Sequence, residues 1–330
     1  MRNTFVLNCF WGMLLLLTGV SCQSCTSEKS QEKEWVTETS WLPIADPYVL
    51  LYEGKYYAYG TGGTVEGEGF ACFSSDDLVN WIREGQALFA KDSYGTWGFW
   101  APEVYYIEAQ KKFYMFYSAE ERICVATADR PQGPFRQTLK QPIWEEKSID
   151  TSLFIDDDGT PYLYFVRFTD GNVIWVARLN EGLTGIKENT LTECVKVSEP
   201  WELSQDKPAR VAEGPSVLKK NGIYYLFYSA NHFESRNYGV GYATATNPLG
   251  PWKKCEDNPI LQRADGLVGT GHGAPFCDKK GYWKYIFHAH WNTDTVQPRT
   301  SFIKDLSLSG EGIADIGGTL IRPKVVTRKK

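Results

Sequence analysis

The strongest constraint on how this chain can fold is a strand–turn–strand pattern that occurs five times along its 330 residues. Each copy begins with a polar or charged residue and continues with an alternating strand, a short turn and a strand rich in aromatic residues. In the clearest copy, RVAEGPSVLKKNGIYYLFYSA, Glu213 precedes a Gly-Pro pair and Asn221-Gly222 forms the hairpin turn. The residues at the head of the other four copies are Asp46, Glu103, Asp150 and His272.

The spacing of these copies predicts the fold. Their heads lie 57, 47, 63 and 59 residues apart, so the repeat is about 57 residues long. No window combines apolar residues at helical spacing with caps at both ends. Repeats of this length are typical of β-propeller blades, whose innermost strands meet around a central axis. We therefore expect an all-β, five-bladed β-propeller whose central funnel receives the side chains of Asp46, Asp150, Glu213 and His272.

The N-terminal residues predict export. Residues 1–21 contain one early Arg, the apolar run WGMLLLL and small residues before Cys22. This run is well under the roughly 18–20 residues of a membrane span, so it indicates a signal peptide. The ending GVSC resembles a bacterial lipobox with Cys22 as the lipidated residue, and a plain secretory signal is the alternative. Residues 22–40 predict a flexible tether, and residues 41–325 the propeller. The expected location is the outer membrane of a diderm bacterium, facing the periplasm or the cell surface.

Charge and cysteine usage limit the classes of partner. Residues 1–21 contain one Arg and no acid, so the mature chain keeps 34 basic and 40 acidic residues. This net negative charge disfavours nucleic acid and anionic membrane surfaces, leaving a lipid anchor at Cys22 as the expected membrane contact. The cysteines after the tether have no CxxC spacing and are expected to be small buried residues rather than disulfides or metal ligands. They are Cys72, Cys124, Cys194, Cys255 and Cys277.

Aromatic residues make up 15 % of the chain, including 12 Trp and 19 Tyr. Flat rings cover the apolar C–H faces of sugars, which favours a glycan-binding funnel in an exported protein. The alternative is that β-rich cores simply favour Tyr, Phe and Trp. Trp97 and Trp100, in GTWGFWAPE, precede the second innermost strand, so we expect both near the mouth of the funnel.

Five motifs in order resemble glycoside hydrolase family 43, the five-bladed-propeller hydrolases of arabinan and xylan. They are ADP around Asp46, FWAPE around Trp100, IDTSLF around Asp150, EGP around Glu213 and GTGHGAPF around His272. The resemblance covers about residues 41–320. It implies that Asp46 is the general base, Glu213 the general acid and Asp150 a third carboxylate that orients the acid and tunes its pKa. It also implies that Arg299 contacts the sugar, and that His272 lies under the funnel, where family members often hold calcium or another cation through water. No other cofactor is expected.

The implied chemistry needs carboxylates in two protonation states. Hydrolysis with inversion uses a protonated acid and an ionised base roughly 6.5–9.5 Å apart, with water between the base and the sugar. We expect the charge of Asp150 to raise the pKa of Glu213, while an exposed, hydrogen-bonded Asp46 stays ionised. The alternatives are an Asp-Pro turn at Asp46, a loop position for Asp150 and a surface Glu beside a turn for Glu213.

Two histidines and the substrate complete the expectations. His288 and His290, in FHAHW, lie on one face of a strand, but without a third ligand they indicate a structural role rather than a metal site. Family members include α-L-arabinofuranosidases, endo-arabinanases, β-xylosidases and exo-β-galactosidases. Many of the β-xylosidases carry an added β-sandwich for which this chain has no room, so we expect an exo-acting α-L-arabinofuranosidase on arabinose- or xylose-containing chains. A β-xylosidase, an endo-arabinanase and a non-catalytic glycan-binding propeller are the alternatives.

Overall fold

The computed structural model of the protein describes residues 35–328. The expected signal peptide, Cys22 and most of the expected tether lie outside these residues. The last part of the expected tether forms strand β1 (Trp35–Trp41). Within residues 35–328, no helix is long and apolar enough to cross a membrane.

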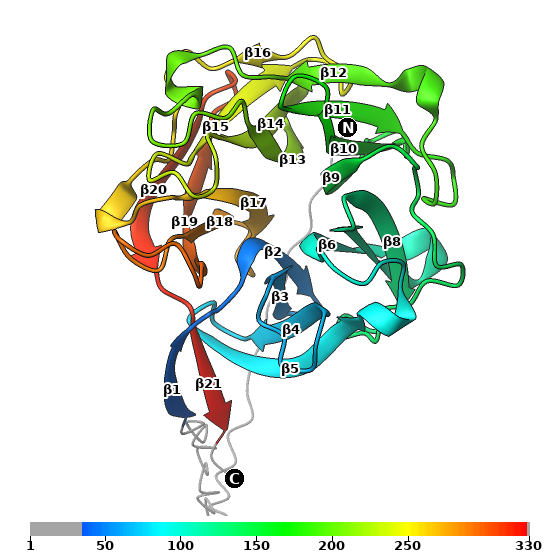
Figure 1. Ribbon diagram of the computed structural model, residues 1–330, viewed down its shortest axis with the longest axis vertical. Helices are drawn as coiled ribbons and strands as arrows, with labels where there is room; N and C mark the ends of the chain where they lie inside the picture. The colour runs from blue at the N-terminus through cyan, green and yellow to red at the C-terminus, as the bar shows by residue number, and fades with distance from the viewer. Residues whose placement is uncertain (1–34, 329–330) are drawn as a thin grey trace, which may run out of the picture. The chain divides into compact units, whose positions relative to one another are not determined.

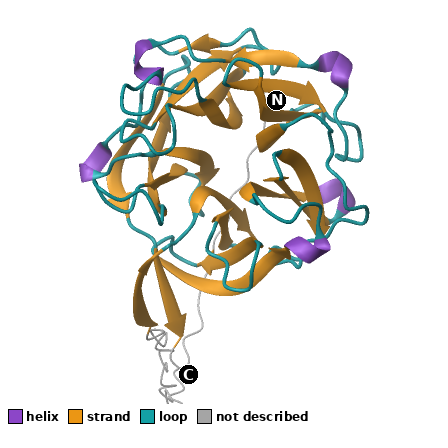
Figure 2. Ribbon diagram, viewed as in Figure 1, coloured by secondary structure: helices purple, strands orange, loops and turns teal. Residues whose placement is uncertain are grey.

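Five small antiparallel sheets stand around a central axis, which confirms the predicted all-β, five-bladed propeller (Figures 1 and 2). Blade I contains β2 (Ala45–Tyr52), β3 (Lys55–Thr61), β4 (Gly69–Ser75) and β5 (Asn80–Phe89). Blade II contains β6 (Trp100–Ile107), β7 (Lys112–Ala119) and β8 (Arg122–Ala128). Blade III contains β9 (Ser148–Ile155), β10 (Pro161–Phe168), β11 (Asn172–Arg178) and β12 (Thr192–Val195).

Blade IV contains β13 (Ala212–Lys220), β14 (Ile223–Ala230), β15 (Gly239–Ala245) and β16 (Lys253–Lys254). Blade V contains β17 (Gly271–Cys277), β18 (Trp283–Ala289), β19 (Thr300–Leu308) and β20 (Ala314–Ile321). The first strand of every blade is the innermost one in Figure 1. Five short 3₁₀ turns lie between strands, at Ala90–Asp92, Glu108–Gln110, Glu188–Thr190, Pro200–Glu202 and Ala264–Gly266.

The two ends of the described chain meet at blade I. Each blade is built from consecutive strands, and β21 (Lys324–Arg328) instead pairs with β1 and with the outer strand β5 of blade I. The β1–β21 ribbon projects from the outside of the ring (Figure 1). Near the axis, Ser301 of blade V donates its backbone N–H to Leu42 and its hydroxyl to the carbonyl of Ile44. These bonds join the last blade to the first.

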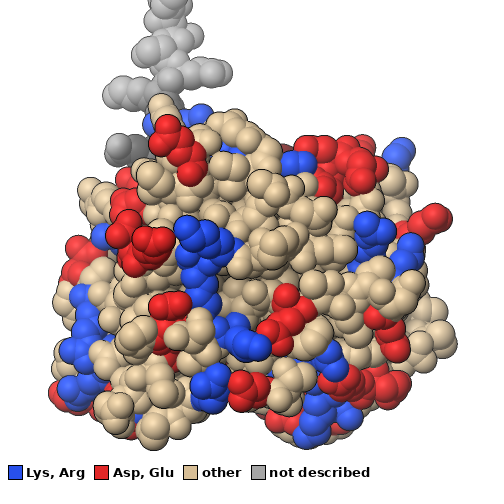
Figure 3. All heavy atoms as spheres, turned by 90° about the horizontal axis from the view of Figure 1, so that it is seen from above, with Lys and Arg blue, Asp and Glu red and all other residues tan. Residues whose placement is uncertain are grey.

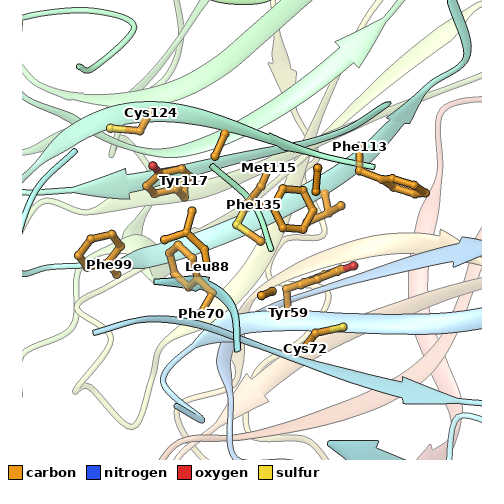
Figure 4. Close-up of a cluster of buried hydrophobic side chains, with 14 of the residues drawn as sticks. Tyr59, Phe70, Cys72, Leu88, Phe99, Phe113, Met115, Tyr117, Cys124 and Phe135 are labelled. Atoms are coloured by element: carbon orange, nitrogen blue, oxygen red, sulfur yellow. The ribbon is translucent and has the colours of Figure 1, made fainter. Parts of the chain in front are cut away.

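The aromatic second strands pack blade against blade. Figure 4 shows the cluster between blades I and II, where Tyr59 and Phe70 face Met115 and Tyr117. Burial of these rings supplies most of the driving force for joining adjacent blades. The five cysteines expected to be small buried residues are free thiols. Cys72 and Cys124 are fully buried in this cluster, and Cys194, Cys255 and Cys277 are partly buried.

A β-bulge in the first strand of every blade shapes the axis. Two residues of this strand oppose one residue of the second strand, and the first of the two has a left-handed backbone, with φ between +40° and +57°. These residues are Asp46, Ala101, Asp150, Gly214 and His272. The sequence pattern predicts Glu103 and Glu213 at the equivalent positions, and this prediction is wrong. Glu103 lies two residues after the bulged residue of blade II, and Glu213 lies one residue before that of blade IV. The correct alignment superposes the Pro, Thr or Gly that follows each bulged residue.

Candidate active site

A cavity of about 810 Å³ lies over these bulges and is lined by residues from all five blades. Of the residues expected at the site, six line it: Asp46, Trp100, Asp150, Glu213, His272 and Arg299. Trp97 does not line it; its ring is half exposed and packs edge-on against Trp100 at 6.1 Å. The structure therefore brings the three carboxylates into one pocket, with Trp97 beside its wall.

Each bulge is held by a side chain from the preceding blade. In four blades, a residue near the end of the second strand pairs with the residue just before the bulge of its own blade. The side chain of this residue accepts a hydrogen bond from the backbone N–H of the bulged residue in the next blade. These acceptors are Thr61 for Ala101 (2.9 Å), Ser118 for Asp150 (3.0 Å), Ser229 for His272 (2.7 Å) and His288 for Asp46 (3.1 Å). We call this set the bulge caps.

One junction departs from this pattern. In blade III the equivalent residue is Val166, whose side chain cannot accept a hydrogen bond. The carboxylate of Asp150 takes its place and accepts the backbone N–H of Gly214 at 3.2 Å. The third carboxylate is thus fixed to the residue that directly follows Glu213.

Asp46 is buried and surrounded by positive or neutral donors. Its Oδ1 accepts a hydrogen bond from Arg299 Nη1 at 2.9 Å and lies 3.2 Å from His288 Nδ1 and 3.4 Å from His272 Nδ1. Burial raises the pKa of Asp46, but these neighbours outweigh burial and hold it well below its usual value. Burial lowers the pKa of both histidines, to about 3 for His288, so both are neutral near pH 7 and Arg299 supplies the charge.

The expectation of an exposed Asp46 was wrong, because only 8 % of the residue is exposed. It remains ionised through Arg299 rather than through contact with water. Arg299 itself stacks on Phe233, with the guanidinium carbon 4.8 Å from the ring centre. Its buried Nε has no hydrogen-bond partner among the described residues.

Glu213 has the surroundings of a general acid. Burial raises its pKa to about 7 as the largest cause, and the negative charge of Asp46 adds to this rise. Two donors oppose it: Tyr238 Oη donates to Oε1 at 2.9 Å and Asn172 Nδ2 donates to Oε2 at 2.8 Å. Glu213 is therefore partly protonated at neutral pH and fixed at both oxygens, while Asp46 stays ionised.

Asp150 differs from its expected electrostatic role. We expected its charge to raise the pKa of Glu213, but burial and Asp46 cause that rise. The pKa of Asp150 is itself raised well above its usual value, first by burial and then by the charge of Glu213. Two neighbouring buried carboxylates share one negative charge more readily than they carry two, so each holds a proton more readily than an isolated carboxylate would.

Comparisons with known proteins identify the family. The family model for glycosyl hydrolases family 43 matches residues 42–313. The chain belongs to this family. A β-D-galactofuranosidase of Aspergillus niger is 28 % identical over 276 residues, which cover 77 % of this chain and 76 % of that protein. A β-xylosidase of Xylanibacter ruminicola is 28 % identical over 316 residues, covering 82 % and 95 %.

A solved structure extends the comparison. The endo-1,4-β-xylanase from Bacteroides thetaiotaomicron VPI-5482 is 69 % identical, and the match covers 88 % of this chain and 100 % of that chain with a TM-score of 0.87. The protein is accordingly a family 43 glycoside hydrolase, and its fold and enzyme class are those that the sequence motifs implied.

In this family 43 hydrolase, His272 fills the floor of the pocket. An added Cβ at Gly214 would lie 2.9 Å from the His272 ring, so glycine at this position gives the ring its room. Below it, a cavity of about 10 Å³ is lined by Glu103, Asp150 and Thr151 and has room for about one water. No three His, Cys, Asp or Glu side chains within residues 35–328 are arranged to hold a metal ion. These residues do not fit a directly bound cation, and a cation held through water at His272 stays a prediction.

The sequence reasoning missed three residues that contact the carboxylates of this hydrolase: Asn172, Tyr238 and His288. The position of His288 carried a usable signal, because the strand endings YAYGT, YMFYS, YLFYS and YIFH align it with the other bulge caps. Asn172 begins the third strand of blade III and Tyr238 lies just before that of blade IV, where the repeat gives no comparable signal. His290 contacts the carbonyl of Phe233 instead of sharing a ligand with His288, and His232 lines the pocket.

Proposed function

We propose that this family 43 hydrolase is an exo-acting, inverting α-L-arabinofuranosidase that removes arabinofuranosyl groups from xylan chains. The observation that carries the proposal is one pocket in which an ionised Asp46 and a protonatable Glu213 have opposite pKa shifts. Two titratable groups pushed apart in this way provide a base and an acid in the same site. A pocket that draws its walls from all five blades suits a terminal sugar better than the middle of a chain.

In the proposed reaction, Asp46 takes a proton from a water molecule as that water attacks the anomeric carbon. Glu213 gives its proton to the departing glycosidic oxygen, while Tyr238 and Asn172 hold the carboxyl group in place. Asp150 fixes the backbone beside the acid, and Arg299 keeps the base ionised and donates to the sugar. Each proton transfer thus has a donor and an acceptor in the pocket.

Furanose chemistry and xylan both have support among the similar proteins. The Aspergillus protein is named for β-D-galactofuranosides, and the furanose ring of β-D-galactofuranose has the configuration of α-L-arabinofuranose with one further carbon. The Xylanibacter and Bacteroides proteins are named for xylose-linked or β-1,4-xylan substrates. A furanosyl group attached to xylan is an arabinofuranosyl side group. β-Xylosidase activity is the second candidate, favoured by those same two names.

Trp100 and Trp97 are proposed to bind the sugar chain that leaves. Trp100 lines the pocket, and the half-exposed Trp97 continues the aromatic surface outward from it. An exposed ring beside a sugar pocket offers a stacking platform for the next residue of the chain. On the face shown in Figure 3, basic and acidic side chains are interspersed, so that face has no continuous basic surface for a polyanion.

A panel of substrates tests the proposal. We expect release from 4-nitrophenyl α-L-arabinofuranoside and from arabinoxylan, with the inverted anomer appearing first by proton NMR. Faster release from the β-D-xylopyranoside would favour the β-xylosidase instead. A Trp97→Ala variant should raise KM for arabinoxylan while leaving the nitrophenyl substrate unchanged, because only the longer substrate reaches that ring. Binding of oligosaccharides without any hydrolysis would contradict the enzyme proposal.

We also propose that the enzyme is exported and anchored to the outer membrane by a lipid on Cys22. Full-length protein made in a diderm bacterium should partition into detergent and incorporate a fatty-acid analogue, whereas a Cys22→Ser variant should do neither. Labelling that persists in Cys22→Ser but is lost in Cys25→Ser would move the anchor to Cys25. No labelling of the wild-type protein would indicate a plain secretory signal.

A further inference from the structure

We propose that His288 is a positioning residue for the general base, and that it holds the backbone and the carboxylate of Asp46 together at the junction of blades V and I. The inference rests on the proposed function, because it assigns the base to Asp46. His288 is fully buried and does not itself line the sugar pocket. Its influence on the reaction therefore passes through Asp46.

The bulge caps show why a histidine at this place is more than a structural acceptor. Where the next blade's bulged residue is Ala101, Asp150 or His272, a hydroxyl of Thr or Ser is sufficient to accept its backbone N–H. The junction that leads to Asp46 uses the larger His288 for the same bond, at 3.1 Å. Holding the bulge alone does not require an imidazole, so the ring has an additional task.

The additional contacts of the ring identify that task. Nδ1 lies 3.2 Å from the carboxylate oxygen Oδ1 of Asp46, and Nε2 lies 3.3 Å from Nη1 of Arg299, which itself binds that oxygen. With the proton on Nε2, Nδ1 accepts the Asp46 N–H; with the proton on Nδ1, the ring donates to the carboxylate and Nε2 accepts from Arg299. Both neutral tautomers therefore bind Asp46.

The flat face of the His288 ring is also held in place. Tyr238 stacks on His288 with ring centres 5.6 Å apart and planes 16° apart. The hydroxyl of Tyr238 donates to Glu213, so one continuous set of contacts runs from the base through His288 and Tyr238 to the acid. A group clamped between Arg299 and a buried aromatic ring has little freedom, which suits it to orient a carboxylate towards water.

A His288→Ser variant separates the cap from the positioning role. Serine at this place can reach the backbone N–H, as Ser229 does in the neighbouring blade, but it has no second nitrogen for Arg299. We expect kcat on 4-nitrophenyl α-L-arabinofuranoside to fall about tenfold to hundredfold while KM stays within about twofold, because the lost bond orients the attacking water. The loss should be the same factor on a dinitrophenyl glycoside, since the base is needed for both leaving groups.

Thr61→Val is the matched control. It removes a cap of the same kind, but from Ala101, which carries no reacting group. It should lower the melting temperature more than His288→Ser does, because valine cannot accept the N–H, with a smaller loss of kcat. His288→Asn is a second test variant, since its amide can accept the N–H and donate to the carboxylate, and it should recover part of the kcat lost in His288→Ser.

Three outcomes would overturn the proposal. A kcat of His288→Ser within twofold of the wild-type value would show that the ring is only a cap. A loss confined to KM, or one much smaller on the dinitrophenyl substrate, would place its effect on the sugar or on Glu213. Failure of both His288→Ser and His288→Asn to fold would assign His288 to closing the ring. Failure of the proposed function is seen separately, in wild-type protein that hydrolyses none of the glycosides.

Discussion

At the residue scale, the surroundings of each carboxylate suit it to its proposed part in the reaction. Asp46 is paired with a guanidinium that cannot lose its proton, whereas Glu213 is buried among neutral donors and beside other acids. Burial alone would protonate both. The difference between them is therefore set by Arg299, which binds one carboxylate directly.

The pH dependence of activity follows from Glu213. An acid must be protonated to act, so activity should fall as the pH rises through about 7, the pKa of Glu213. The hydrogen bond from Tyr238 stabilises the ionised carboxylate, so a Tyr238→Phe variant should raise this pKa and move the basic limb of kcat/KM to higher pH. Tyr225→Phe is the control, because it removes a hydroxyl that donates to the carbonyl of Ser309 and bonds none of the three carboxylates. A basic limb that stays in place or moves down would contradict this account.

The leaving group separates the acid from the base. Glu213→Ala should lower kcat on natural glycosides by about 10²- to 10⁴-fold, yet much less on a dinitrophenyl glycoside, whose leaving group departs as an anion. Asp46→Ala removes the group that activates water and should be equally impaired on both. Steady-state kinetics on the two substrates measure the difference. Equal losses for Glu213→Ala would remove it from the role of acid.

At the element scale, the β-bulge is the device that converts a repeated strand into a site. It places a left-handed residue at the axis end of every blade, and four of the five are not glycine. Side chains are strained in this conformation, at a cost of about 1–3 kcal/mol each. Three of these strained positions hold Asp46, Asp150 and His272, so the strain coincides with the pocket.

Gly214 is the bulged residue that has to be glycine. A Gly214→Ala variant should lose about 1–2 kcal/mol from the left-handed backbone and about 1–3 kcal/mol more from the clash with the His272 ring 2.9 Å away. It should also lose activity, because Glu213 is its neighbour. Gly222→Ala, in the turn of the same hairpin with φ of +79°, meets nothing within 4 Å and should cost only the backbone part. Urea unfolding and kcat of both variants provide the measurements, and similar losses in the two would contradict the clash.

At the scale of the whole molecule, the contact between the two ends of the described chain and the proposed catalytic groups use different parts of the structure. The ends meet outside blade I, where Val325 of β21 is buried with Leu42, Trp81 and Ile303. The reacting groups lie on the axis, on the first strands of the blades. Stability and activity should therefore respond separately to changes at the closure.

A Val325→Ala variant tests this separation. Loss of the buried side chain should lower the free energy of unfolding by about 1.5–3 kcal/mol. The kcat of the folded enzyme should not change, because the substitution leaves the bulges intact. Val65→Ala, at a side chain that is 70 % exposed, should change neither quantity. A fall in kcat at temperatures where Val325→Ala is fully folded would show that closure and site are coupled.

The five-bladed fold could be predicted from the sequence alone, because alternation, turns and repeat length are local properties of the chain. The catalytic roles of Asp46, Asp150 and Glu213 came from the resemblance to family 43 and stay predictions, although the structure brings the three side chains into one pocket. The sequence pattern placed Glu103 and Glu213 at the bulge positions that Ala101 and Gly214 occupy. A bulge can be located only when the pairing with the neighbouring strand is known. The sequence pattern also missed His288, Tyr238 and Asn172 and the burial of Asp46. Those depend on which residues of different blades come within hydrogen-bond distance, and only closure of the ring brings together residues as distant in sequence as Asp46 and His288, 242 positions apart.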